Sequence, residues 1–287
     1  DSNYREFPVE LEQHARVEVV KDGGLRAELN VTRTISQSSF SQIIRLDAAS
    51  DTLVFDTTVD WKELHRLLKV EFPVDVETLE GINEIQFGYM KRPVHRSRQY
   101  DKDRYEVCNH RYTALADESH GAAVLNDCKY GVSMDKNAIQ LTLLRASASP
   151  EMRADNRVHH FVYGFMAWEG SFLESPVVQR GYELNVPMQM AEGACETRSA
   201  FGIDRDNVIL DTVKLAEDGS GDFILRLYES KRADTTARVR LGIPAVSAAL
   251  CSMMEEEEET AVMEGNELVL HFKPFEIKTV RVKIERK

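Results

Sequence analysis

The side chains best suited to chemistry gather in one polar loop, residues 92–104, of an otherwise acidic chain. Guanidinium and imidazole groups donate several hydrogen bonds and attract anions. The loop holds only two carboxylates, Asp101 and Asp103, against the basic side chains of Arg92, His95, Arg96, Arg98, Lys102 and Arg104. The simplest prediction is that Arg92 pairs with Glu106 or Asp127 and fixes the loop.

The segments on either side of this loop show features of strands and turns. Apolar residues alternate just before it, which predicts a strand with one face formed by Ile85, Phe87 and Tyr89. Pro93 lacks a backbone donor and biases the residue before it away from helix, so we expect the chain to leave the sheet there. Further on, Asn126 and Asp127 close a strand, and such residues commonly form turns through side-chain-to-backbone bonds.

Sequence motifs of common enzymes and phosphate-binding proteins are missing. The chain contains no G-x-S-x-G elbow, Walker loop, G-x-G-x-x-G or H-E-x-x-H pattern. Gly219-Ser220-Gly221 lies between two expected strands and is interpreted as a hairpin turn. Trp61 and Trp168 have rings that could stack on a sugar, but the alternating strand around Trp61 favours a core position.

Charge and hydropathy exclude two classes of partner. The 287 residues carry a formal net charge of −12, whereas general nucleic-acid binding needs a broad basic surface. No apolar run approaches the roughly 20 residues that span a bilayer. The first residues, 1–7, have no signal-peptide pattern, so we expect no secretion and no membrane attachment.

The cysteines point to a reducing compartment. The chain has four, without any C-x-x-C spacing, at Cys108, Cys128, Cys195 and Cys251. We interpret them as reduced thiols of a cytoplasmic protein, and a Cys108–Cys128 bridge is the alternative.

The elements expected to position these residues are strands. Alternating apolar residues predict strands at 25–32, 40–46, 53–61, 68–72, 139–143 and 161–165. After a passage between 187 and 202, short strands with turn signals about every ten residues follow at 208–213, 223–228, 237–241, 268–272 and 280–284. Five consecutive glutamates, 255–259, are expected on a solvated turn or edge. The fold class is therefore all-β, with a large antiparallel sandwich at 1–200 and a small sandwich at 201–287.

Several short segments together resemble a known family. They are Val59-Asp60-Trp61, Gln86-Phe87-Gly88-Tyr89, Arg92-Pro93-Val94-His95, Tyr105-Glu106-Val107-Cys108, Asn126-Asp127-Cys128-Lys129-Tyr130-Gly131, Leu141-Thr142-Leu143-Leu144-Arg145 and Pro274-Phe275-Glu276-Ile277. Their order and spacing resemble the C-terminal β-domain of family 38 glycoside hydrolases, the α-mannosidases, in the bacterial and cytosolic-type branch. The resemblance implies a mutarotase-like large sandwich, which this chain enters partway through, followed by a small one.

The resemblance also implies that the reactive groups lie elsewhere. Retaining glycoside hydrolysis uses two carboxyl groups about 5 Å apart. In this family they lie on an α/β catalytic domain that also holds a divalent metal, typically zinc, through a His-x-Asp pair. None of the eight histidines here has Asp two residues later. We therefore expect no catalytic residue, metal or cofactor in this chain, and the partners implied are an N-terminal catalytic domain, mannose-containing oligosaccharide and a second copy of the chain.

A small set of residues is carried over from the family's motifs. Asp155, Arg157 and His159 match parts of a stretch that lies near the family's active site, which implies substrate binding, with Arg157 donating paired hydrogen bonds to sugar hydroxyls. The alternative is that Asp155 and Arg157 only hold a loop together. Glycine stands at the position of Arg157 in the bacterial branch. Arg92 and His95, with Asn126 and Asp127, are expected at the catalytic-domain interface or as loop-structuring residues.

Two other functions remain open at this point. A free-standing carbohydrate-binding sandwich is the main alternative, because sandwiches host many functions. A mutarotase-like epimerase would need a His/Glu acid–base pair, into which His159 or His160 fits without support from spacing.

Overall fold

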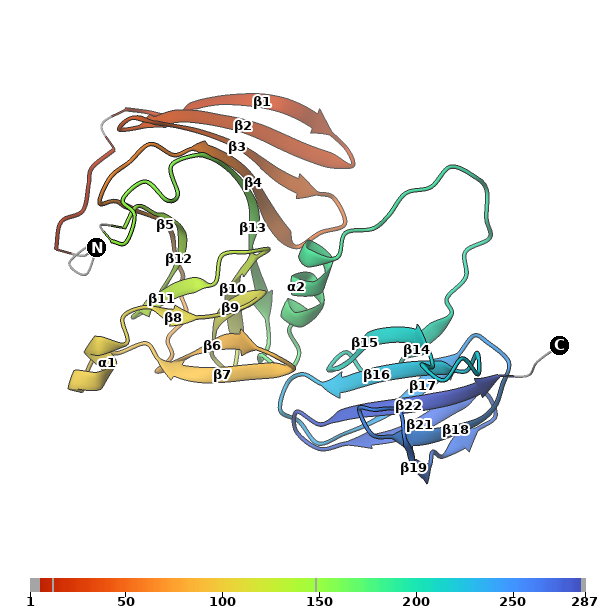
Figure 1. Ribbon diagram of the computed structural model, residues 1–287. Coiled ribbons are helices and arrows are strands. Elements are labelled where there is room, and N and C mark those ends of the chain that lie inside the picture. Colours follow the sequence, from red (N-terminus) through yellow and green to blue (C-terminus); the bar gives the residue numbers. More distant parts are fainter. Residues whose placement is uncertain (1–5, 12, 148, 285–287) are drawn as a thin grey trace. The chain divides into compact units, whose positions relative to one another are not determined.

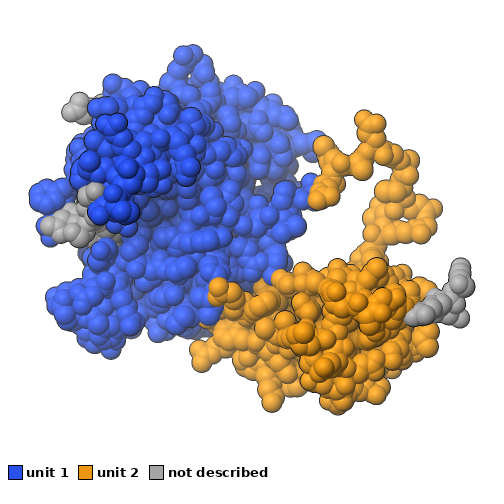
Figure 2. All heavy atoms as spheres, in the orientation of Figure 1, with its two compact units in different colours: residues 1–85, 90–188 blue, residues 86–89, 189–287 orange. Residues whose placement is uncertain are grey.

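The computed structural model describes residues 6–11, 13–147 and 149–284. Their regular structure is almost entirely β-strand, with only two short helices among the described residues, α1 (Gln99–Asp103) and α2 (Val177–Asn185) (Figure 1). They divide into two compact units, shown in different colours in Figure 2. The large sandwich comprises residues 1–85 and 90–188, and the small sandwich comprises residues 86–89 and 189–287. The all-β prediction is confirmed.

The large sandwich is built on a wide antiparallel sheet. Within the described residues this sheet has nine strands, in the order β1 (Arg16–Gly23), β2 (Arg26–Ile35), β3 (Ser38–Asp47), β4 (Thr52–Asp60), β13 (Val158–Glu169), β10 (His120–Asn126), β9 (Tyr112–Ala116), β6 (Glu80–Ile85) and β7 (Gly88–Pro93) (Figure 1). The pairing of β4 with β13 joins segments about a hundred residues apart, with Val59 opposite His159. Distant parts of the sequence are thereby fixed in one register.

The second sheet of the large sandwich is narrower. Its described strands number four, in the order β5 (Leu67–Pro73), β12 (Ala138–Arg145), β11 (Gly131–Asp135) and β8 (Val107–Cys108). Alternate residues of both sheets point inward, as the two-residue period requires. The resulting core is contiguous and includes the fully buried side chains of Val59, Phe161, Ile139 and Leu141. Burying such large apolar side chains contributes about 1.5–3 kcal/mol each.

The first strand of the wide sheet differs from the others in exposure. All eight residues of β1 are exposed, including Val17, Val19 and Val20. The alternation in β2 is weaker than in β4, because Ala27 and Leu29 are exposed on one face of the sheet while their neighbours are half-buried. This end of the wide sheet therefore contributes little to the core.

The strand predicted across Ile85, Phe87 and Tyr89 is wrong. β6 ends at Ile85, residues 86 and 87 form a turn in which Phe87 has φ +56°, and β7 begins at Gly88. The aromatic residues there pack against residues of the small sandwich. The Phe87 ring meets Tyr228 edge-on at 5.3 Å, and the Tyr89 ring meets Phe275 at 5.1 Å. The apolar alternation thus arises from packing around a turn and not from a strand face.

Two further antiparallel sheets form the small sandwich. One contains β14 (Phe201–Ile203), β17 (Thr235–Leu241), β21 (Glu267–Phe272) and β20 (Met263–Glu264). The other contains β15 (Val208–Leu215), β16 (Phe223–Glu229), β22 (Ile277–Ile284), β18 (Ala245–Cys251) and β19 (Glu257–Thr260). Their inner faces enclose a core that includes Leu225, Val239, Leu268 and Val280. The sequence predicted β15, β16, β17, β21 and β22 here, but not β14, β18, β19 or β20.

The glutamate run and the segment between the units occupy peripheral positions. Glu257, Glu258 and Glu259 lie on β19, an exposed edge strand, as expected. Residues 187–200 contain no helix or strand. The sequence-based boundary at 200/201 and the change of compact unit after residue 188 differ only by this irregular segment and by residues 86–89; the domain boundary itself stays a prediction. Neither described helix is long and apolar enough to cross a membrane.

Candidate functional site

The residues expected to bind substrate lie where the chain enters β13. The backbone carbonyl of Asp155 accepts a hydrogen bond from Nε2 of His159 at 2.7 Å. Arg157 is joined to the end of β4 through its backbone, because its carbonyl accepts from the Trp61 amide at 3.0 Å. The structure therefore brings Asp155 and His159 together and ties this segment to the wide sheet.

The Arg157 side chain stands apart from that arrangement. It is exposed and makes no hydrogen bond or ion pair with any described residue. Next to it, the amide oxygen of Asn156 is buried without a hydrogen-bond partner among the described residues. The adjacent His160 pairs with Asp56 across the strands at 2.7 Å. Contact of Arg157 with a sugar stays a prediction, and its guanidinium is accessible for one.

The partner of Arg92 differs from the predicted carboxylates. Its Nη1 donates to the backbone carbonyl of Cys108 at 3.0 Å, and Nη2 approaches the weakly accepting Met90 Sδ at 3.9 Å. Glu106 instead accepts from Lys69 on β5, at 2.8 Å, and from Thr142 on β12. Burial and the nearby positive charge of Arg104 lower the pKa of Arg92. Arg92 is thus a cation without a carboxylate partner among the described residues.

His95 lies in the same loop, shortly before α1. Its Nδ1 is 2.9 Å from the Ser97 hydroxyl and 3.9 Å from a carboxylate oxygen of Asp101. Asp101 is buried and accepts hydrogen bonds from the amide and the guanidinium of Arg98. The pKa of Asp101 is lowered chiefly by the Arg98 guanidinium. Arg98 and Asp101 therefore fix the beginning of α1.

Asn126 and Asp127 hold a crowded turn together. The buried Asn126 amide donates to Asn109 Oδ1 at 2.9 Å and to the His110 carbonyl at 2.6 Å, while its oxygen accepts from the Lys129 amide at 2.7 Å. Asp127 accepts from the amide of Val162 on β13 at 2.9 Å. These contacts are those of turn-forming side chains, whereas an interface role stays a prediction.

A cavity of about 640 Å³ opens at one end of the large sandwich. Its walls come from three segments that are distant in the sequence. They are residues 7–11 with 13, residues 34–36, and residues 61, 63 and 65–69. The buried Trp61 lines it together with Glu63, whose carboxylate accepts from the Gln37 amide at 2.9 Å and the Ser38 hydroxyl at 2.7 Å. The cavity falls within the size range of small-molecule sites. Sequence reasoning missed it, because no local pattern reveals that these three segments meet.

A second charged cluster joins the sheet to the helix of the large sandwich. Arg111 pairs with the buried Glu84 at 2.6 Å and lies over the ring of Tyr182 on α2, 3.7 Å from its centroid. Burial opposes the charge of Arg111, but hydrogen bonds and attraction from Glu84 outweigh burial and raise its pKa. This arrangement fixes α2 against β9.

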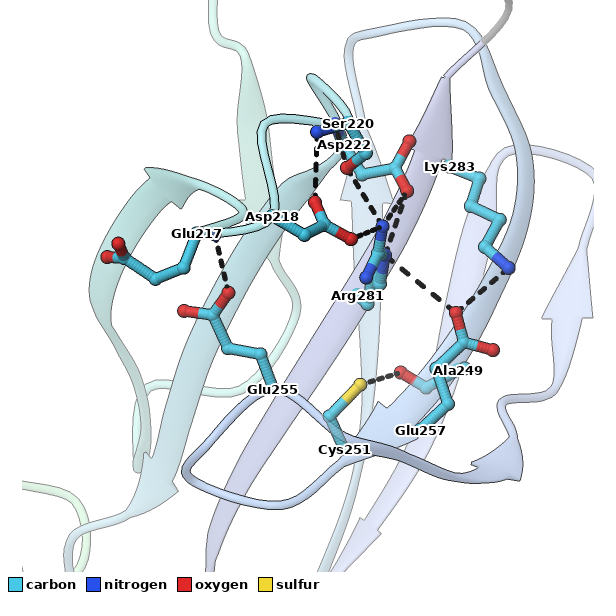
Figure 3. Close-up of polar contacts among 10 residues, drawn as sticks. All are labelled: Glu217, Asp218, Ser220, Asp222, Ala249, Cys251, Glu255, Glu257, Arg281 and Lys283. Carbon is cyan, nitrogen blue, oxygen red and sulfur yellow. Dashed lines mark hydrogen bonds and ion pairs between the residues drawn. The ribbon is translucent and has the colours of Figure 1, made fainter.

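The small sandwich contains a saturated ionic network around Arg281 on β22 (Figure 3). Its guanidinium donates to Asp222 at 2.8 Å, to Asp218 at 2.8 Å and to the Ser220 hydroxyl at 2.8 Å. The hydrogen bond to Asp222, then that to Asp218, raises the pKa of Arg281, and Ser220 followed by Arg281 lowers the pKa of Asp218. The loop that contains Gly219-Ser220-Gly221 is therefore a hairpin connection held by an arginine, in agreement with its interpretation as a turn.

Few side chains of the described residues are arranged for metal binding or redox chemistry. No set of three or more His, Cys, Asp or Glu side chains within the described ranges is placed to hold a metal ion. All four cysteines are free thiols, and Cys251 is the buried one. Burial, followed by Asp127, raises the pKa of Cys128 to about 11, which disfavours its reactive thiolate.

Both halves of the chain match models of one protein family. Residues 1–153 match the "Glycosyl hydrolases family 38 C-terminal domain", and residues 207–280 match the "Glycosyl hydrolases family 38 C-terminal beta sandwich domain". Apart from residues 86–89, the two matched regions fall in the large and the small sandwich respectively. The resemblance seen in the sequence motifs is thereby confirmed.

Individual relatives give the same result. The chain is 37% identical to Alpha-mannosidase 2C1 of Mus musculus over 94% of its own length and 27% of that protein, and 33% identical to Alpha-mannosidase G of Dictyostelium discoideum over 92% and 26%. It thus spans about a quarter of these relatives. The crystal structure of an alpha-mannosidase from Enterococcus faecalis V583 has the same fold, with a TM-score of 0.77 at 15% identity over 94% of this chain and 35% of that one. The chain belongs to the family of glycosyl hydrolase family 38 C-terminal domains.

Proposed function

We propose that this chain is the non-catalytic C-terminal β-region of an α-mannosidase. In the full-length enzyme it packs on the N-terminal catalytic domain and shapes the cleft in which α-mannosidic linkages of oligosaccharides are hydrolysed with retention. The observation that carries this proposal is that one continuous alignment covers 94% of this chain but only 27% of a relative named as an alpha-mannosidase. The remaining length of such an enzyme is where the reaction's two carboxyl groups and its zinc or other divalent metal are expected.

Within this proposal the exposed Arg157 is the residue directed at substrate. A guanidinium without a partner among the described residues can give two parallel hydrogen bonds to neighbouring sugar hydroxyls. Asp155 and His159 position it, because their mutual hydrogen bond shapes the segment on either side. The four free thiols support a cytoplasmic location, and a homo-oligomer of the whole enzyme is part of the proposal.

Hydrolysis of a chromogenic α-mannoside tests the non-catalytic assignment. We expect the purified 287-residue chain to give no turnover with added zinc, while the Mus musculus relative, assayed in parallel, gives turnover. Turnover by the chain that a chelator abolishes, and that survives repurification, would show that the reactive groups are in this polypeptide.

A free-standing carbohydrate-binding module is the second candidate, and the cavity of about 640 Å³ in the large sandwich favours it. An aromatic side chain and charged groups at the cavity wall, Trp61 with Glu63 and Arg66, are of the kinds that bind sugars. Calorimetry with mannose oligosaccharides separates the two functions. The C-terminal-region proposal expects no measurable heat of binding, whereas a saturable heat that Arg66→Gln removes would favour the module.

A further inference from the structure

A second, much smaller cavity lies in the large sandwich, beside the basic loop. It has a volume of about 30 Å³, enough for one or two waters or part of a small anion. Two arginines face it, Arg92 at the end of β7 and Arg104 just after α1. Asp101, Val107 and Ser133 complete most of the wall. The two arginines that face the cavity thus lie on either side of α1 in the sequence.

Neither arginine has a carboxylate partner among the described residues. Arg92 donates only to the Cys108 carbonyl at 3.0 Å and the Met90 sulfur at 3.9 Å. The Arg104 guanidinium lies over the Tyr100 ring, 5.2 Å from its centroid. The two guanidinium groups carry ten N–H donors in total. The Cys108 carbonyl and the Tyr100 ring face leave several of these donors unused.

The carboxylates near the cavity are already engaged. Asp101 takes the Arg98 guanidinium at 3.0 Å, and Asp135 takes Arg96 at 3.1 Å. Glu106 takes Lys69 at 2.8 Å. Each of these three acids therefore has its own cation, and none of them forms an ion pair with Arg92 or Arg104 among the described residues.

The two unpaired charges also act on each other. Arg92 is half-buried, and burial together with the charge of Arg104 lowers its pKa. A partly desolvated cation next to a second cation is costly unless an anion joins them. An oxyanion in the cavity would receive charge-assisted hydrogen bonds from both forks.

We propose that the cavity between Arg92 and Arg104 is a binding site for a small oxyanion, with inorganic phosphate as its simplest ligand. Arg92, held by the Cys108 carbonyl, supplies the fixed half of the site. Arg104, stacked on Tyr100, supplies the half that faces solvent. Binding involves no covalent step, and the proposal is independent of mannoside hydrolysis.

Phosphate titration followed by calorimetry tests this site in the intact chain. We expect saturable binding at one site when ionic strength is kept constant with chloride. Arg92→Gln and Arg104→Gln should each weaken the affinity at least about tenfold, because each removes charge-assisted hydrogen bonds of the ligand. Arg92→Lys, which keeps the charge and loses the fork, should restore part of the loss.

The matched control is Lys102→Gln, which removes the same charge from the same loop at an exposed position away from the cavity wall. It should leave the affinity within about twofold. Circular dichroism establishes that each variant is folded. Arg104→Gln changes an exposed side chain, so we expect this variant to fold even if Arg92→Gln does not. Absence of saturable phosphate binding, or equal losses in Lys102→Gln and Arg104→Gln, would overturn the proposal.

Discussion

Arg281 in the small sandwich and Arg92 in the large sandwich are both partly withdrawn from water, but their surroundings are opposite. Arg281 is only 13% exposed and satisfies its charge with Asp218 and Asp222 at 2.8 and 2.7 Å. Arg92 meets a backbone carbonyl and the field of Arg104. A guanidinium enclosed by its own chain's carboxylates stabilises the fold, whereas one without them is available for a ligand or a partner.

The same contrast appears in the packing of the two sandwiches. The described sheets of the small sandwich contain five and four strands, so their faces nearly match. Those of the large sandwich contain nine and four, and the outermost strand β1 is exposed along its whole length. The small sandwich thus has the features of a self-sufficient support, and the large sandwich offers the open surface, both cavities and the unpaired arginines.

The largest expected effect is a loss of stability of the large sandwich at alkaline pH. Tyr163 is buried in the large core, stacked on Phe55 at 4.9 Å, and burial raises its pKa to about 12. Because an unfolded tyrosine ionises near pH 10, folding stability is retained below about pH 10 and lost progressively toward about pH 12, by about 3 kcal/mol. Urea unfolding across this range measures it. Tyr163→Phe should flatten the loss, and an unchanged slope in that variant would contradict the assignment.

The small sandwich should respond to loss of its central cation. Arg281→Gln leaves Asp222 nearly buried without its partner, so we expect about 2 kcal/mol of destabilisation, between the values for surface and buried pairs. The pKa of Asp218 is lowered, so its contribution to folding stability is present above about pH 4 and is lost as the pH falls. The Arg281→Gln variant should therefore lose less folding stability on acidification than the unchanged chain. Urea unfolding at neutral and acid pH measures both. Arg198→Gln, at an exposed pair, is the control, expected below about 0.5 kcal/mol.

A glycine substitution tests whether the turn at residues 86–89 belongs to the packing of the small sandwich. A Cβ at Gly88 would lie 2.8 Å from the Phe275 ring, so Gly88→Ala should cost about 1–2 kcal/mol. At Gly24 nothing lies within 4 Å of an added Cβ, and Gly24→Ala should be close to neutral. Thermal unfolding of both variants gives the difference. Equal melting temperatures would mean that Phe275 does not constrain the turn.

The smallest effect is expected at the unpaired arginine. Arg92→Gln removes a hydrogen bond to a carbonyl and also a repulsion with Arg104, so its cost should stay below about 1 kcal/mol. Denaturant unfolding without phosphate, side by side with Arg281→Gln, measures the contrast. A loss at Arg92 as large as that at Arg281 would show that the large sandwich depends on this cation for its own stability.

Strands with one clearly buried face were the most predictable from the sequence. Alternation located β4, β12 and β22, whose inward residues are buried in turn. β19 is exposed at every residue, and β18 contains mainly small side chains, so neither carries a strong two-residue signal. The prediction also failed at Phe87. This apolar residue lies in a turn and packs on Tyr228, so it does not mark a strand face.

The candidate site was less predictable than the fold. The sequence singled out Arg92 and Asp155, but it could not identify Glu106 as the partner of Lys69, because that pairing depends on the sheet order β5-β12-β11-β8. The walls of both cavities likewise come from segments that only the sheet order brings together. Local patterns predict elements, whereas these contacts depend on which strands become neighbours.

The most direct test of the central claim, that this chain supplies a scaffold and not the reactive groups, is a hybrid enzyme. In it, the segment of the Mus musculus relative that aligns with this chain is replaced by this chain, and kcat/KM is measured with an α-mannoside. We predict that the hybrid hydrolyses the substrate, whereas the relative ending before the exchanged segment does not. A folded hybrid no more active than that shortened enzyme would contradict the account.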